Sequence, residues 1–249
     1  MLRQVAALTR RNLVRIKNDP GQLFEATVMP MVLALVFIYV FGGAIGGDHG
    51  DYRQYLMPGI MVETACFASR STGIGMNLDF DNGVMDRFRS LPIARSAVLS
   101  ARIIAELCRM LLGQVVILAF AYLIGFRIHT GILPALAAIG MIMLFGMALC
   151  WVSAFIGLAV RSPQTVQSVG FVWLIPLQFG SSMFAPTDTM PGWLKAFADV
   201  NPISFVINTC RALLTGGPVT PHLLPALACI VAIVAVFAPL AVRQFFRRT

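Results

Sequence analysis

Residues 79–95, DFDNGVMDRFRSLPIAR, form a charged island between two apolar runs, 55–78 and 100–125. Each run is long enough to cross a lipid bilayer. Proline disfavours helix at the residue before it, so a short helix from about 81 to 90 would end ahead of Pro92 and the chain would turn back. The island therefore predicts a charged surface segment on which a partner could dock. A solvated loop that only sets membrane topology is the alternative.

The composition is that of a membrane protein. Of the 249 residues, 58% are apolar and 12% are charged, and the mean hydropathy is +0.80, whereas soluble domains are about 25% charged. Six runs reach the roughly 20 residues that a hydrocarbon core requires: 27–46, 55–78, 100–125, 133–160, 165–184 and 222–242. They are continuously apolar and do not alternate, so we expect helices rather than barrel strands. The predicted fold is one all-α integral membrane domain, 1–249, with six transmembrane helices.

The basic residues indicate which side of the membrane each loop occupies. The net charge is +8, but no basic patch with interleaved aromatics predicts nucleic-acid binding. Thirteen Lys and Arg residues fall on one predicted side and four on the other, which places both termini in the cytoplasm. Residues 1–20 predict an amphipathic interfacial helix, with an unstructured basic tail as the alternative.

The segment 185–221 before the last run is the longest predicted outer loop. Its apolar stretch, 203–214, is too short to span the bilayer, which favours a re-entrant or interfacial helix. An ordinary amphipathic loop helix explains the stretch equally well. Trp193 is expected at headgroup level. Asn201, Pro202 and Arg211 are the other candidate residues of this outer region.

Four ionisable residues within the predicted spans are candidates for a translocation path or a subunit seam. Glu63 and Arg70 are seven residues apart and so share one helix face. Glu106 and Arg109, at i and i+3, can pair directly. Charges inside a membrane are costly, and they are functional hypotheses by default. For Glu106 and Arg109 we favour a fixed structural pair, whereas Arg70 is the better functional candidate.

The chain lacks the sequence motifs of an enzyme. Neither Lys17 nor Lys195 follows a phosphate-binding loop, so we expect no ATP bound to this chain. The three histidines are far apart, and the five cysteines have neither metal-ligand nor redox spacing. We therefore expect no cofactor, metal or catalytic residue in this chain.

Two segments resemble type-2 ABC exporter permeases of the daunorubicin-resistance kind. One is NGVMDRFRSLPIAR at 82–95. The other combines FAP at 184–186, MPGWL at 190–194, NPIS at 201–204 and RALLTG at 211–216. The resemblance implies a half-transporter in the bacterial cytoplasmic membrane. Two six-span permease subunits, identical or different, would sit on two separate ATPase subunits that bind ATP and magnesium. It assigns ATPase coupling to Asp86, Arg87, Phe88, Arg89, Leu91, Pro92 and Arg95.

The resemblance also implies export of amphipathic drug-like, antibiotic or lipid-like compounds. Phe67, Trp173 and Phe179 are candidate wall residues by position, although core packing is the favoured role for each. A polysaccharide or lipo-oligosaccharide permease is the alternative, opposed weakly by only four Tyr and three Trp. A proton-coupled secondary transporter, with Glu63 as the titrating carboxylate, is the alternative of another class. A structural membrane protein with no transport function is a further alternative, and only the two family motifs argue against it.

Overall fold

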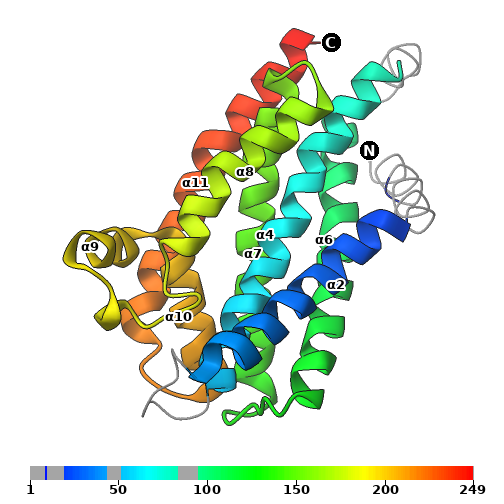
Figure 1. Cartoon of the computed structure of the whole chain (residues 1–249). Coiled ribbons are helices and arrows are strands. Elements are labelled where there is room, and N and C mark those ends of the chain that lie inside the picture. The colour runs from blue at the N-terminus through cyan, green and yellow to red at the C-terminus, as the bar shows by residue number, and fades with distance from the viewer. Residues whose placement is uncertain (1–8, 10–19, 44–51, 84–94, 249) are drawn as a thin grey trace.

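The computed structural model describes residue 9 and residues 20–43, 52–83 and 95–248 (Figure 1). Throughout these ranges the regular structure is helical, without a strand, as the composition predicts. The elements are α2 (Pro20–Val36), π-helix η1 (Phe37–Phe41), α4 (Tyr52–Asp81), α6 (Arg95–Leu123), α7 (Ile132–Ala159), α8 (Pro163–Phe179), 3-10 helix η2 (Thr187–Thr189), α9 (Gly192–Val200), α10 (Pro202–Thr215) and α11 (Thr220–Arg248).

Helices α4 and α7 form the centre of the bundle. Helix α7 packs on α4, α6, α8, α10 and α11, while α4 also contacts α2, α6, α8 and α10. Helix α2 crosses α4 at a slant in Figure 1. We call the end where α4 ends, α6 begins and α11 ends the charged end, and the opposite end the α10 end (Figure 1).

Within the described ranges, three helices are long and apolar enough to cross a membrane, namely α6 from Leu99, α7 and α11. This agrees with a membrane protein. Helix α4 has 30 residues but a low apolar content, since it carries four charged residues in and after its centre: Glu63, Arg70, Asp79 and Asp81. Helix α8 has 17 residues. Most of the expected interfacial helix, 1–20, lies outside the described residues, as do 84–94 of the island.

Helix α8 is shorter than the expected run 165–184, because it ends at Phe179. The side-chain amide of Asn201 donates to the carbonyls of Leu177 and Gly180, at 2.7 and 2.8 Å. These bonds satisfy acceptors that the end of a helix leaves free. A Cβ on Gly180 would lie only 2.5 Å from the ring of Phe197. Tertiary contacts from α9 and α10 therefore end α8 early.

Small residues bring α4 and α7 into backbone contact. A Cβ on Gly73 would lie 2.2 Å from the carbonyl oxygen of Ser153, and one on Gly157 would lie 2.2 Å from that of Gly73. Ser153 Oγ accepts from the Gly73 amide and donates to the Arg70 carbonyl, both at 3.0 Å. Any larger side chain at these glycines would force the two central helices apart.

Candidate functional site

A buried ionic network joins α4 to α6 at the charged end. Glu106 pairs with Arg109 at 2.8 Å and lies 3.8 Å from Arg102. Arg102 also lies 3.7 Å from Asp79. All four side chains are buried. Among the described residues, two carboxylates and two guanidinium groups balance in charge, which offsets part of the cost of taking them out of water.

The backbone of α4 also binds this network. Arg109 donates to the Ala68 carbonyl at 2.7 Å and to the Ser71 hydroxyl, while Arg102 donates to the Ser71 carbonyl at 3.2 Å. A Cβ on Gly75 would be 1.6 Å from the Arg102 guanidinium, so any larger residue would displace that group from its present position. The pair expected for Glu106 and Arg109 is confirmed, and it belongs to a larger cluster that fixes α6 to α4.

The last turn of α7 is tied to α4 and α11 at the same end. The amide of Asn77 donates to the carbonyls of Gly157 and Val160, at 3.0 and 2.7 Å. Arg248 donates to these two carbonyls at 3.0 and 2.9 Å. Such carbonyls have no partner within their own helix and carry the negative end of its dipole. An amide and a guanidinium therefore clamp the end of α7.

The residues of this network lie in the helices on either side of the charged island. Asp79 and Asp81 belong to the last turn of α4, and Arg95 is the first residue of α6. The other candidate coupling residues, Asp86, Arg87, Phe88, Arg89, Leu91 and Pro92, lie outside the described residues. Both helices that flank the island are thus joined by buried charges within a few turns of its ends.

Glu63 and Arg70 are both buried in α4. Arg70 sits between two aromatic rings, 4.2 Å from the centroids of both Phe67 and Phe171. This geometry suits a cation–π contact, and Phe67 therefore packs on a cation. Glu63 Oε2 has no hydrogen-bond partner in the part of the chain that the structure describes. Glu106 Oε1 also lacks a hydrogen-bond partner there, but Glu106 is paired with Arg109, so Glu63 is the buried carboxylate whose role the packing explains least.

At the α10 end, Arg211 is held by neutral groups. It donates to the carbonyls of Tyr55 and Ser182, at 3.1 and 2.9 Å, and to the side-chain oxygen of Asn208 at 2.7 Å. Its guanidinium lies 3.7 Å from the centroid of the Tyr55 ring. The Tyr55 hydroxyl donates to the Ser182 carbonyl at 2.8 Å. Arg211 thus connects α10, α4 and the segment after α8.

Asn201 and Pro202 begin α10. Asn201 Oδ1 accepts from the Ile203 amide at 2.9 Å, and Pro202 occupies the first helical turn, which are the positions that helix starts favour for these residues. Helix α10 packs on α4, α7 and α11 and buries eight of its 14 residues. The 203–214 stretch is therefore built into the bundle. A helix lying only on the surface does not describe it.

Helix α9 presents exposed groups. Trp193 is 75% exposed. Lys195 Nζ lies 2.5 Å from a carboxylate oxygen of Asp188. The hydrogen bond and positive charge of Lys195 lower the pKa of Asp188, and the same contact raises the pKa of Lys195. Both groups face solvent, so this pair contributes little to stability.

The remaining wall candidates differ in their surroundings. Phe179 is 56% exposed, whereas Trp173 borders a cavity described below. Among the described residues, no group of three or more His, Cys, Asp or Glu is arranged to hold a metal ion.

Sequence reasoning did not identify Asp79 and Arg102 as partners of the buried pair: it assigned Asp79 to the charged island and did not single out Arg102. The four-residue spacing of Arg102 and Glu106 on one helix was an available signal. It also missed Tyr55, Ser182 and Asn208 around Arg211. Tyr55 and Ser182 are far from Arg211 in sequence, so no local pattern could reveal those two contacts.

Comparison with known proteins now decides the family. The family model described as ABC-2 type transporter matches residues 3–215. The chain belongs to the ABC-2 type transporter family. This ABC-2 permease is 32% identical, over 94% of its length and 83% of the relative's, to "Daunorubicin resistance ABC transporter permease protein DrrB1" of Streptomyces coeruleorubidus.

Two relatives from Mycobacterium tuberculosis also match. "Probable doxorubicin resistance ABC transporter permease protein DrrC" is 28% identical over 96% of the ABC-2 permease and 87% of the relative. "Doxorubicin resistance ABC transporter permease protein DrrB" is 26% identical over 88% and 80%. The resemblance drawn from the two sequence segments is confirmed, and the chain is a multi-pass membrane protein of the ABC transporter permease type.

Proposed function

We propose that this chain is the membrane-spanning subunit of an ATP-driven exporter. Its spans would be α2 with η1, α4, α6, α7, α8 and α11, in the bacterial cytoplasmic membrane with both termini inside. The observation that carries the proposal is the family match over 3–215, which includes the charged island. ATP and magnesium would bind to separate ATPase subunits, and a second permease subunit would complete the path.

Coupling would begin at the island. An ATPase that holds Asp86, Arg87, Phe88, Arg89, Leu91, Pro92 and Arg95 would move the ends of α4 and α6 together, because Glu106, Arg109, Arg102 and Asp79 join these helices. Asn77 would pass the motion to α7. Packed, discretely bonded elements are what a coupling path requires physically.

The α10 end would form the exit gate. Arg211 and Asn201 bind the segment after α8 to α10, so a movement of α8 would have to break or carry these contacts. In this view α9 and α10 form the outer re-entrant region, with Trp193 at headgroup level.

The cargo would be amphipathic, drug-like, antibiotic or lipid-like, because the similar proteins carry names of daunorubicin and doxorubicin resistance. Polysaccharide or lipo-oligosaccharide remains the second cargo class. The test is co-purification of the chain with its candidate ATPase in lipid nanodiscs, followed by ATP turnover with amphipathic drugs and with lipid-linked sugars. Stimulation by drugs supports the proposal. Stimulation by sugars alone would transfer it to the second class.

A proton-coupled secondary transporter is favoured by one observation, the buried Glu63 whose Oε2 lacks a hydrogen-bond partner among the described residues. Glu63→Gln keeps the shape of the side chain and removes its titration. Transport that persists in this variant and requires ATP would exclude the proton-driven mechanism. Transport that follows a proton gradient without any ATPase would exclude the exporter.

A further inference from the structure

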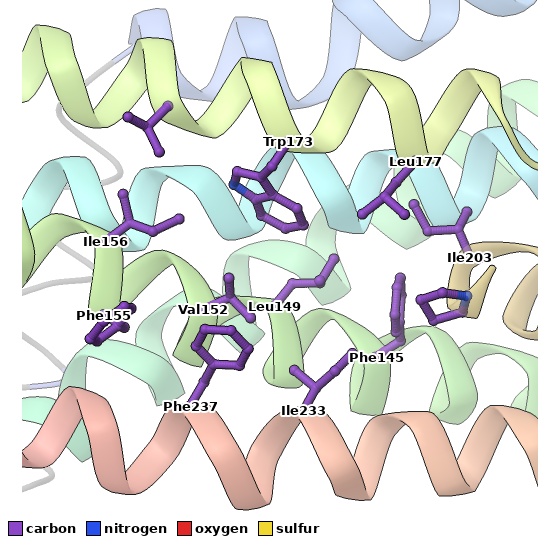
Figure 2. Close-up of a pocket in the computed structure, with 12 residues that line it drawn as sticks. Phe145, Leu149, Val152, Phe155, Ile156, Trp173, Leu177, Ile203, Ile233 and Phe237 are labelled. Atoms are coloured by element: carbon purple, nitrogen blue, oxygen red, sulfur yellow. The ribbon is translucent and has the colours of Figure 1, made fainter. Parts of the chain in front are cut away.

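An apolar cavity of about 490 Å³ lies between α7, α8 and α11 (Figure 2). Leu149 and Phe155 of α7, Val169 and Trp173 of α8, and Phe237 of α11 contribute to its walls. All twelve lining residues are apolar or aromatic. A charged or strongly polar ligand would lose its hydration there without gaining polar partners. The cavity therefore fits a hydrocarbon.

The cavity is elongated along the helices. On α7 its lining runs from Phe145 to Ile156, which is about 16 Å at 1.5 Å per residue. On α8 it runs from Val169 to Leu177, or about 12 Å. A hydrocarbon core is about 30 Å thick, so the cavity is as long as one leaflet is deep.

The cavity borders an exposed apolar surface of the bundle. Its lining residue Val169 is 37% exposed, and the neighbouring faces of α8 and α11 carry exposed apolar side chains, including Val172 at 74% and Val231 at 65%. Helices α8 and α11 each pack on α7. In a membrane protein, such a surface meets acyl chains rather than water wherever no other subunit covers it, so hydrocarbon is available there at the cavity's edge.

We propose that one acyl chain of a bilayer lipid occupies this cavity, wedged between α8 and α11 against α7. The proposal does not depend on which compound the subunit exports. Pro202 and Ile203 border it on the side of α10. A resident chain would support α8, so lipids whose chains fill the cavity would stabilise the present arrangement of α8 and α11.

Quenching of Trp173 by brominated lipid tests this directly. In the full chain, Trp151→Phe and Trp193→Phe leave Trp173 as the sole tryptophan. The protein is reconstituted with phosphatidylcholine brominated at mid-chain. Val169→Phe fills the cavity one turn from Trp173, whereas Val172→Phe adds the same ring to the exposed face of the same helix. We expect strong quenching in the parent and in the Val172 variant, and loss of most of it in the Val169 variant.

A second variant keeps the test valid even if Val169→Phe impairs folding. Phe237→Ala enlarges the cavity and should increase quenching, whereas Val236→Ala, on the exposed face of α11, should not. Equal quenching in the filled, enlarged and control proteins would overturn the proposal. Quenching of Trp173 that falls as the protein-to-lipid ratio rises would also overturn the proposal. It would show that a second copy of the chain covers the cavity. Neither result bears on ATPase stimulation, so a failure of the proposed export function is recognised separately.

Discussion

The two ends of the helix bundle hold buried arginines in different ways. At the charged end, Arg102 and Arg109 face the carboxylates of Asp79 and Glu106. At the α10 end, the groups that accept hydrogen bonds from Arg211 are two carbonyls and one amide oxygen, beside the Tyr55 ring. The first arrangement depends on charge balance and the second on shape and neutral acceptors. The ends should therefore respond differently to the loss of one side chain.

Loss of Glu106 should have the largest effect. Among the described residues, Glu106→Ala leaves two buried guanidinium groups with one carboxylate, and breaking a buried pair in this way costs about 3–5 kcal/mol of unfolding free energy. Chemical unfolding in mixed micelles measures it. Asp199→Ala, an exposed carboxylate, is the control and should change little. A loss no larger than the control's would mean that the network does not hold α4 and α6 together.

Loss of Arg211 should lower the unfolding free energy less than loss of Glu106 does. Arg211→Ala removes the charge itself, while the Ser182 carbonyl keeps its hydrogen bond from the Tyr55 hydroxyl and Asn208 Oδ1 keeps the one from Ser182 Oγ. The loss of the guanidinium hydrogen bonds should cost about 1–3 kcal/mol of unfolding free energy. The same unfolding measurement applies. If Arg211→Ala proved more costly than Glu106→Ala, charge balance would not be what distinguishes the two ends.

Filling the space beside Arg102 should have a moderate effect. Gly75→Ala places a methyl group on the guanidinium, displacing the end of a flexible side chain and costing about 1 kcal/mol. Gly140→Ala on α7 meets nothing within 4 Å and should be neutral or stabilising, because alanine favours helix. Thermal midpoints of the two variants give the comparison. Equal midpoints would show that Arg102 does not need the space above Gly75.

The exposed pair on α9 should have the smallest effect. Lys195→Ala removes the partner that lowers the pKa of Asp188. A lowered carboxylate pKa stabilises the fold above that pKa, and the contribution is lost as the pH falls through it. Because the pair faces solvent, the thermal midpoints of variant and parent should agree at neutral and at acidic pH. A clear drop at neutral pH alone would show that this pair anchors α9.

Local patterns allowed much of this fold to be predicted. Apolar runs marked the helices, and three-residue spacing placed Glu106 beside Arg109. Prediction failed where distant segments meet. The amide of Asn201 ends α8 at Phe179, and Arg211 finds Tyr55 and Ser182 across the fold. Burial of Asp79 depends on an arginine of the next helix, so its sequence neighbours, which are charged, suggested a surface position.

Charge reversal in the island tests the central claim most directly. The measurement is ATP turnover of the co-purified ATPase in nanodiscs with the Arg87→Glu, Arg89→Glu double variant. The control reverses Arg243 and Arg247, which are exposed at the same end of the bundle on α11. We predict that the island variant inserts normally but no longer stimulates turnover, while the control stimulates it as the parent does. Full stimulation by the island variant would contradict coupling through residues 79–95.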